Sequence, residues 1–197
     1  MPEPRRRLLQ AFAATAAVAA WPARQPQAFA RHGRIEPAEP VPDLTVLRDD
    51  GARLPLERQL RGRITALHFM FTGCTSTCPI QGATFARVQA LLGPQRAERL
   101  QLLSVSVDAL GDDPASLARW RAALSAGPRW RAAVPIAAHG TRLLDWASAG
   151  GRSGADVHAT QVLLIDERAR LVFRSVDLPD ARQVADLLVS LEASSRG

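Results

Sequence analysis

The chain has 197 residues, of which 47% are hydrophobic and 22% are charged, so its length and composition are those of one globular domain. All 25 residues counted as Lys or Arg are arginine, which explains a sequence pI of about 11.1 and a formal net charge of +6. Beyond the N-terminus the arginines form no dense run and are not interleaved with aromatic residues, so we expect no nucleic-acid partner.

The first thirty residues have the features of an export signal. Arg5-Arg6-Arg7 is followed by Leu8-Leu9, by an Ala-rich apolar run over residues 11–21 and by Ala28-Phe29-Ala30. Basic, apolar and small-residue segments in this order are typical of a secretory signal peptide, and the paired arginines before Leu-Leu resemble a twin-arginine signal. The apolar run is shorter than the roughly 20 residues that a membrane span needs. We therefore expect a periplasmic protein that is attached to the membrane only if the signal is retained as an anchor.

This signal also sets the expected domain boundaries. Residues 1–30 are predicted to be the export signal, residues 31–40 a flexible lead-in rich in Arg, Glu and Pro, and residues 41–197 a single domain. An exported domain works in an oxidising compartment, where disulfides persist and copper is accessible.

The body of the chain opens with strand patterns. Residues 41–47 and 52–54 flank Asp49-Asp50-Gly51, whose Asp and Gly suit a tight turn, so we predict an N-terminal β-hairpin. Residues 64–71 form a near-continuous apolar run, which is typical of a central strand covered on both faces. Residues 79–92 then fit a helix that begins with proline.

The rest of the chain alternates strand and helix patterns. Alternating helices and apolar strands predict an α/β domain with a central mixed sheet and helices on both faces, in a thioredoxin-like order with an insertion. The further predicted elements are a strand over 100–107, a helix from Asp113-Pro114 to Leu124, a short strand over 130–136, a short helix over 141–149, a loop over 152–158, strands over 160–166 and 171–176, and a helix over 179–191.

Both cysteines of the chain, Cys74 and Cys78, lie between the predicted central strand and the helix that follows it. A spacing of four places the two sulfur atoms on one side of a helix that begins at or near Cys74. Two thiolates on one face suit a soft metal ion, and the same pair can close into a disulfide because a helix N-terminus favours the thiolate. A metal site and a redox pair are thus both open. A purely structural disulfide is less favoured, since a bridge spanning four residues constrains little chain entropy.

Four histidines are candidates for a third metal ligand. His158 is the best of them, because it ends a polar, Gly-containing loop and precedes an apolar strand, which places it near one edge of the sheet. His139 is a rival at the entrance to a short helix. His68 lies inside the predicted central strand and is interpreted as packed core, and His32 belongs to the lead-in.

The segment Phe71-Thr72-Gly73-Cys74-Thr75-Ser76-Thr77-Cys78-Pro79 resembles the Cys-x-x-x-Cys-Pro signature of the Sco/SenC copper proteins. Val105-Ser106-Val107-Asp108 is similar to the strand that those proteins place next, and Trp120 and Trp130 fall in a matching region. His158 and the following residues up to Asp166 resemble the family's histidine segment. The sequence departs from the family at Thr75-Ser76, where Pro-Asp is usual, and at Asp156, since the family's Asp directly precedes the histidine.

The resemblance implies a thioredoxin-like domain that binds copper, as Cu(I) or Cu(II), through Cys74, Cys78 and His158. Family members help to assemble the dinuclear copper centre of cytochrome c oxidase, by delivering copper, by reducing the cysteines of the target, or by both. We therefore expect a periplasmic copper chaperone with a copper-accepting oxidase subunit as its partner. Thiolate ligation requires both sulfurs to be reduced, so a periplasmic thiol reductant is a second expected partner.

The main alternative is a thiol–disulfide oxidoreductase in which Cys74 and Cys78 are catalytic. The spacing weakly disfavours it, because two residues between the cysteines are more common in redox motifs than the three found here. Peroxide reduction by a cysteine of low pKa is compatible with the fold, but no residue beyond the cysteines supports it.

Overall fold

The computed structural model describes residues 32–94, 98–147 and 160–195. Within them, eight strands form one mixed sheet in the order β1-β8-β7-β4-β5-β6-β2-β3. The elements in chain order are β1 (Gly33–Pro40), β2 (Thr45–Arg48), β3 (Arg53–Pro55), α1 (Leu56–Leu60), β4 (Ile64–Met70), α2 (Thr77–Leu92), β5 (Leu100–Ser106), α3 (Pro114–Ala123), β6 (Trp130–Pro135), the 3-10 helix η1 (Ala137–His139), α4 (Gly140–Ala147), β7 (Gln161–Ile165), β8 (Arg170–Asp177) and α5 (Ala181–Ser194).

Strands β4 and β5 form the centre of the sheet, and every residue of both strands is buried. They pair in parallel with each other, β5 pairs in parallel with β6, and β4 pairs antiparallel with β7. Parallel strands with both faces covered read as continuous apolar runs, which is why the sequence pattern located them. The predicted central position of the strand before the cysteines is confirmed.

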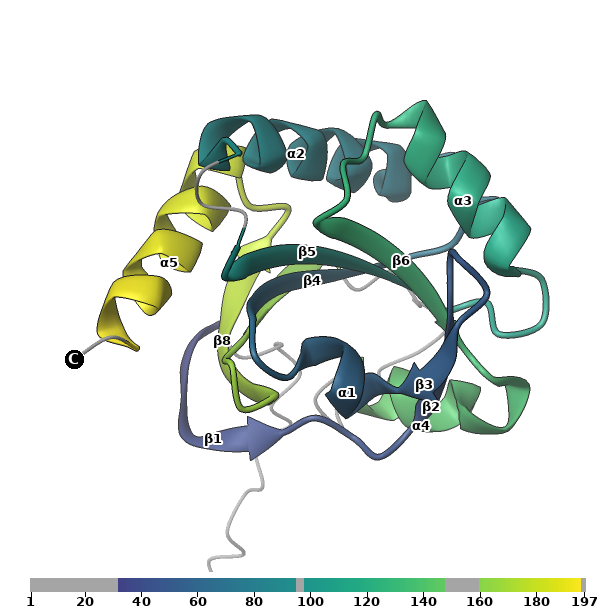
Figure 1. The fold of residues 1–197 in the computed structure, drawn as a ribbon, viewed down its shortest axis with the longest axis horizontal. Helices are drawn as coiled ribbons and strands as arrows, with labels where there is room; N and C mark the ends of the chain where they lie inside the picture. The colour runs from purple at the N-terminus through teal and green to yellow at the C-terminus, as the bar shows by residue number, and fades with distance from the viewer. Residues whose placement is uncertain (1–31, 95–97, 148–159, 196–197) are drawn as a thin grey trace, which may run out of the picture.

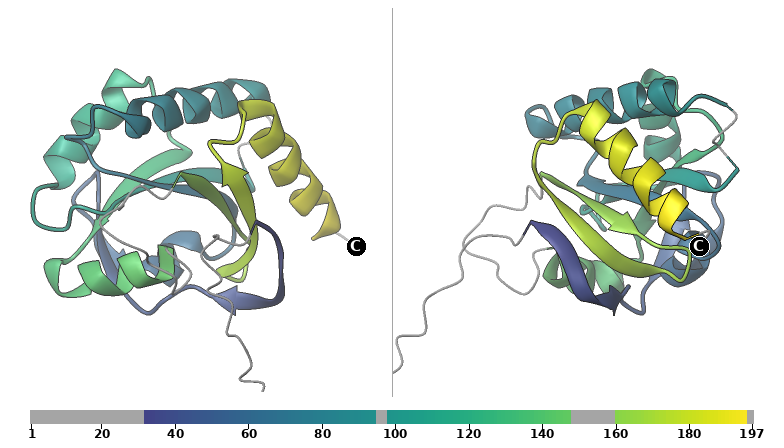
Figure 2. Two further views of the ribbon diagram at one scale, coloured as in Figure 1. Left: turned by 180° about the vertical axis from the view of Figure 1, so that it is seen from behind. Right: turned by 90° about the vertical axis from the view of Figure 1, so that its left-hand side faces the viewer.

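Helices cover both faces of this sheet. In Figure 1, α2 and α3 lie above the sheet, α5 lies at its left-hand side next to α2, and α1 and α4 lie below the sheet; the left view of Figure 2 shows the same arrangement from behind. Side chains alternate across a strand, so Leu67 and Phe69 of β4 enter the core on the α1 and α4 side. Ile64 and Ala66 enter the core beneath α2 and α5. The predicted α/β architecture with helices on both faces is confirmed.

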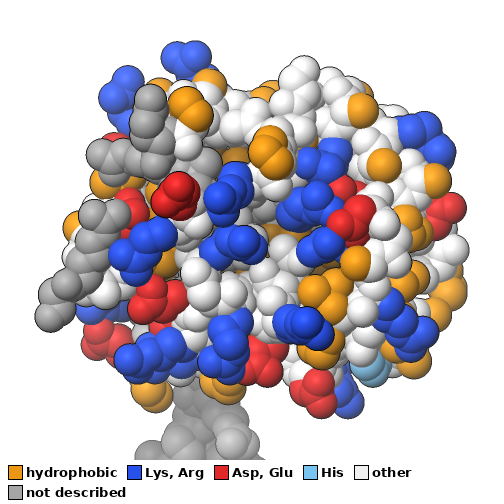
Figure 3. Space-filling view, in the orientation of Figure 1, with side chains coloured by type: hydrophobic (Ala, Val, Ile, Leu, Met, Phe, Trp, Pro, Cys, Tyr) orange, Lys and Arg blue, Asp and Glu red, His pale blue; other side chains and the backbone are white. Residues whose placement is uncertain are grey.

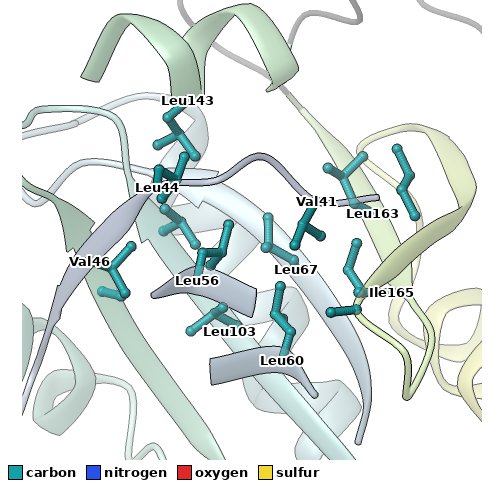
Figure 4. Packing of buried hydrophobic residues seen from close by; sticks show 14 of the residues in the cluster. Val41, Leu44, Val46, Leu56, Leu60, Leu67, Leu103, Leu143, Leu163 and Ile165 are labelled. Atoms are coloured by element: carbon teal, nitrogen blue, oxygen red, sulfur yellow. The ribbon is translucent and has the colours of Figure 1, made fainter. Parts of the chain in front are cut away.

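The lower core joins the segments nearest the N-terminus to the sheet. Val41 and Leu44, which precede β2, are buried there with Leu56 and Leu60 of α1 and Leu143 of α4 (Figure 4). Burying such side chains stabilises the fold by about 1.5–3 kcal/mol each. The β2–β3 hairpin predicted from Asp49-Asp50-Gly51 is therefore part of the domain core, and its strands pair antiparallel as expected.

The expectation of a flexible lead-in over residues 31–40 is wrong for residues 33–40, which form β1. This strand pairs antiparallel with β8 and forms one edge of the sheet. Its Pro37 and Pro40 made it read as a lead-in, but an edge strand tolerates proline because half of its backbone groups need no ladder partner. The domain therefore begins before residue 41. The predicted signal over residues 1–30 lies outside the described residues.

A buried aspartate fixes the hairpin to the sheet. Asp49, only 9% exposed, forms ion pairs with Arg121 of α3 at 2.5 Å and with Arg131 of β6 at 3.2 Å. The backbone N–H of Ala132 donates to the same carboxylate at 3.1 Å. One side chain therefore links the turn after β2 to a helix and to a neighbouring strand.

Arginine is also spread over the surface. On the face seen in Figure 3, Arg side chains lie among acidic ones. Among the described residues, no helix has the length and apolar character needed to cross a membrane.

Candidate metal-binding and redox site

The cysteine pair lies at the carboxyl end of β4, as predicted. The backbone N–H of Val107, just after β5, donates to the carbonyl of Met70 at 2.8 Å, so the two strands stay paired to their last residues. The chain then crosses a short loop and enters α2 at Thr77. This edge is where open parallel sheets most often place chemistry.

The thiol of Cys74 occupies the place of a helix cap. The side chain of Ser76, the N-cap residue of α2, makes no capping hydrogen bond. The backbone N–H of Cys78 donates instead to Cys74 Sγ at 3.4 Å, and the hydroxyl of Ser76 lies 3.6 Å from the same sulfur. The first N–H groups of a helix have no partner within it, so the sulfur satisfies one of them. Cys74 is half-buried and keeps access to solvent.

The second thiol is enclosed. Cys78 is 3% exposed and packs in a small apolar cluster with Met70 of β4 and Leu117 of α3. Both cysteines are free thiols rather than a disulfide. The pair thus combines one accessible sulfur with one that faces the core.

This difference in surroundings separates the acidities of the two thiols. Burial alone would raise the pKa of Cys74, but hydrogen bonds from the Cys78 thiol and from the backbone N–H groups of Ser76 and Cys78 lower it to about 6. Burial, reinforced by the bond to Cys74, raises the pKa of Cys78 to about 12. At neutral pH Cys74 is therefore mainly a thiolate, whereas Cys78 keeps its proton and can stabilise that thiolate.

A buried carboxylate that the sequence analysis did not single out holds the loop before Cys74. Asp112, in the turn between β5 and α3, accepts the backbone N–H of Thr72 at 3.0 Å and also the hydroxyl of Thr72. The Ser106 hydroxyl donates to it at 2.5 Å. The only sequence signal was an Asp just before the helix-capping Asp113, which is a common pattern at helix starts.

Of the predicted ligands, the structure brings Cys74 and Cys78 together, whereas His158 lies outside the described residues. Within residues 32–94, 98–147 and 160–195, no group of three or more His, Cys, Asp or Glu side chains is arranged to hold a metal ion. The rival His139 has a structural partner, since its Nδ1 accepts the backbone N–H of Thr45 at 2.7 Å. That bond ties η1 to the start of β2.

The interpretation of His68 as packed core is confirmed. It is fully buried beneath α2, its ring centre lies 4.1 Å from that of Phe85, and its Nε2 lies 2.6 Å from the hydroxyl of Ser104. The indole N–H of Trp130 donates to the same hydroxyl at 2.9 Å. Burial lowers the pKa of His68 to about 3, although a hydrogen bond with Gln81 acts in the opposite direction. The imidazole is therefore neutral and is part of the core beneath α2.

Comparison with known proteins shows a similarity to one family. The model of the SCO1/SenC family matches residues 38–129, a stretch that contains the cysteine loop and Asp112. Over these residues the chain is similar to the SCO1/SenC family. None of the curated proteins matches this chain.

Solved structures resemble this chain over nearly all of their own length. A SCO1/SenC family lipoprotein from Bacillus anthracis has a TM-score of 0.65 and 17% identity, over 80% of this chain and 99% of that one. ScoI of Bradyrhizobium japonicum, solved with copper bound, has a TM-score of 0.63 and 20% identity, over 77% of this chain and 99% of that one. BsSco, described as having a disulfide switch and as a member of the Sco family of cytochrome c oxidase assembly proteins, has a TM-score of 0.63 and 16% identity, over 82% of this chain and 98% of that one. The predicted thioredoxin-like fold is confirmed.

Proposed function

We propose that this chain is a SCO1/SenC protein and a periplasmic copper chaperone that binds copper through Cys74, Cys78 and His158 and serves the assembly of the dinuclear copper centre of cytochrome c oxidase. The observation that carries the proposal is the reduced thiol pair at the start of α2, where one sulfur is accessible and the other is a turn away. Soft thiolates select Cu(I), and copper here is the cargo rather than a resident cofactor.

Similar proteins support copper as the cargo and an oxidase as the target. The Bradyrhizobium japonicum ScoI structure holds copper, and BsSco is described as belonging to the oxidase assembly proteins. The Bacillus anthracis protein is described as a lipoprotein, which agrees with export of this chain. We propose that the predicted signal over residues 1–30, of the twin-arginine type, directs the export.

His158 completes the proposed ligand set. Strand β7 runs antiparallel to β4, so its first residue, Gln161, lies toward the edge at which β4 ends. His158 precedes Gln161 by three positions in the sequence. Imidazole nitrogen suits Cu(II) as well as zinc, so a histidine added to two thiolates allows either copper oxidation state to be held.

Transfer would proceed by ligand exchange at the accessible sulfur. Cys74 is exposed enough to be approached by an acceptor thiolate, whereas Cys78 is enclosed and would release copper last. Each new sulfur bond from the acceptor replaces one from this protein. Copper therefore moves without being released as a hydrated ion.

The ligand set is tested with the His158→Ala variant. The reduced parent is expected to bind Cu(II) with a sulfur-to-copper charge-transfer band, and His158→Ala to shift that band and weaken Cu(II) binding by about tenfold or more. His139→Ala is the matched control, because His139 already has a backbone partner, and its band should remain that of the parent. An unchanged band and affinity in His158→Ala contradict the assignment.

Thiol–disulfide exchange is a second candidate function, and the asymmetry of the two thiols favours it. The Cys74 thiolate attacks one sulfur of a target disulfide and forms a mixed disulfide, and the displaced target thiolate takes a proton. Cys78 then loses its proton and attacks Cys74 Sγ, which releases the second target thiol and leaves a Cys74–Cys78 disulfide. A periplasmic thiol reductant must return two electrons to this disulfide. Turnover of a disulfide substrate by metal-free protein supports this function.

A further inference from the structure

The carboxylate of Asp112 is 9% exposed and lies between the cysteine loop, the end of β5 and the start of α3. Its Oδ2 accepts the Thr72 backbone N–H and the Ser106 hydroxyl, and its Oδ1 accepts the Thr72 hydroxyl. The Ser116 hydroxyl of α3 is 3.4 Å from Oδ1. Each of these groups donates a hydrogen bond.

The position of Asp112 is itself fixed. Its backbone N–H donates to the Asp108 carbonyl at 3.1 Å, and the next residue, Asp113, caps α3 in a reciprocal pair with Ser116. The Ser106 hydroxyl also accepts the backbone N–H of Asp108 at 3.1 Å. The end of β5 and the start of α3 therefore fix the Asp112 carboxylate. The carboxylate in turn fixes the loop before the cysteines.

Thr72 carries this restraint to the sulfur. Asp112 binds Thr72 at both its backbone and its side chain, so Thr72 can neither shift nor rotate without losing a part-buried hydrogen bond. Two residues on, the backbone N–H of Cys74 donates to the carbonyl of Phe71 at 3.2 Å and closes a tight turn. The place of Cys74 Sγ beside Cys78 follows from where Thr72 is anchored.

We propose that Asp112 is a positioning residue that acts through Thr72 to hold Cys74 at the distance from Cys78 at which the pair closes on a metal ion or on itself. This inference deepens the proposed function, because it names a determinant of the same thiol site. The hydrogen bonds of the Asp112 carboxylate go to Thr72, Ser106 and Ser116, so its effect is on the geometry of the pair. Small misplacements of reacting groups are costly, since a shift of about 1 Å can lower a rate by about 10²-fold.

A carboxylate suits this role because it only accepts hydrogen bonds. The Thr72 N–H and the hydroxyls of Thr72 and Ser106 all point donors at Asp112. In Asp112→Asn one oxygen is replaced by an NH2 group, which only donates, so the facing hydroxyl must rotate to accept and the bonds to a charged acceptor are lost. The substitution keeps the shape of the side chain and weakens its hydrogen bonds to Thr72.

The test combines Asp112→Asn with Thr72→Val, which removes only the threonine hydroxyl. The equilibrium between the Cys74–Cys78 dithiol and its disulfide is measured in glutathione buffers, and Cu(I) affinity is measured by competition with a chromophoric chelator. Each single variant is expected to lower the equilibrium constant for disulfide closure about tenfold, which is a rise of about 30 mV in reduction potential. Cu(I) affinity should fall by a similar factor, since both ligands must be held together.

A double-mutant cycle separates positioning from a loss of stability. The double variant should lie close to the single variants, because both substitutions remove one interaction. Asp113→Asn is the matched control: its side chain caps α3 beside Asp112, asparagine also caps, and the potential and Cu(I) affinity should stay within twofold of the parent. All variants are compared well below their unfolding midpoints, and Thr72→Val alone carries the test if Asp112→Asn does not fold.

The outcomes are distinct from those of the proposed function. A parent protein that binds no copper overturns the chaperone proposal but leaves the glutathione measurement able to support Asp112. Folded Asp112→Asn and Thr72→Val proteins with the potential of the parent overturn the positioning role, even if copper binds. Additive effects of the two substitutions overturn it as well, since Asp112 would then act by another route.

Discussion

Two buried aspartates hold two loops of this domain, and they do so with different partners. Asp49 and Asp112 are each 9% exposed. Asp49 is paired with the guanidinium groups of Arg121 and Arg131, whereas the described partners of Asp112 are hydroxyls and a backbone N–H. The first arrangement joins sheet, helix and hairpin by charge. The second fixes a loop by directed, uncharged donors next to the thiols, so geometry rather than charge is controlled there.

Loss of the charged anchor should have the largest effect on stability. Asp49→Ala leaves Arg121 with backbone carbonyls alone and Arg131 with Asp50 alone in a largely buried place. We expect about 3 kcal/mol less free energy of unfolding in urea. The reduction potential of the thiol pair should not change at temperatures where the variant is folded. A shift in that potential would show that the Asp49 region and the thiol region are coupled, and would contradict the separate roles given to the two aspartates.

The thiol region should instead show its asymmetry in reactivity. At pH 7 iodoacetamide is expected to alkylate Cys74 about a hundredfold or more faster than Cys78, because the pKa of Cys74 is about 6 and that of Cys78 about 12. The rate at Cys74 should rise with pH and reach half of its maximum near pH 6, as the thiolate forms. Peptide mass spectrometry over time measures both rates, and equal labelling of the two sites contradicts the asymmetry.

Because of His68, which is buried beneath α2, the free energy of unfolding should fall in acid. Its pKa is about 3 in the folded protein and near 6.5 in the unfolded chain, so only the unfolded chain takes up a proton between these values. The free energy of unfolding should therefore fall by up to about 1.4 kcal/mol per unit as the pH drops below 6.5. His68→Gln should lose this slope, whatever its own stability. Parallel pH profiles for parent and variant would contradict a neutral buried imidazole.

An exposed helix cap should give the smallest loss of stability, and it provides a reference for the larger losses expected above. Asp180 accepts the backbone N–H of Gln183 at 2.9 Å at the start of α5, away from both anchored loops. Asp180→Ala should cost about 1 kcal/mol in thermal or urea unfolding, and Asp180→Asn much less. A loss as large as that of Asp49→Ala would show that burial and charge pairing do not set the difference between these aspartates.

Local patterns predicted the central elements of this fold and the location of the thiols. Each of these signals lies within the element that it indicates. They are the apolar runs of β4 and β5, the turn residues of the hairpin, and the proline after Cys78, which marks the start of α2. Strand β1 was missed because its prolines are acceptable only at an edge that pairing with β8 creates. Helix α1 was missed because its five residues are too few for a period to show.

The details of the site depend on contacts between distant parts of the chain. Asp112 and Thr72 are 40 positions apart in the sequence, and no local pattern near either residue indicates their hydrogen bond. The different acidities of Cys74 and Cys78 follow from which of them faces the core, which four residues of sequence cannot reveal. His158 was selected from its place before a strand, and its role as a ligand stays a prediction.

The most direct test of the central claim is an anaerobic titration of the fully reduced protein with Cu(I) and, separately, with Cu(II), repeated with Cys78→Ser and with His158→Ala. We predict one tightly bound copper per chain in the parent, loss of tight binding in Cys78→Ser, and retained Cu(I) but weakened Cu(II) binding in His158→Ala. A parent that binds no copper tightly in either oxidation state would contradict the chaperone function and leave thiol–disulfide exchange as the activity of the pair.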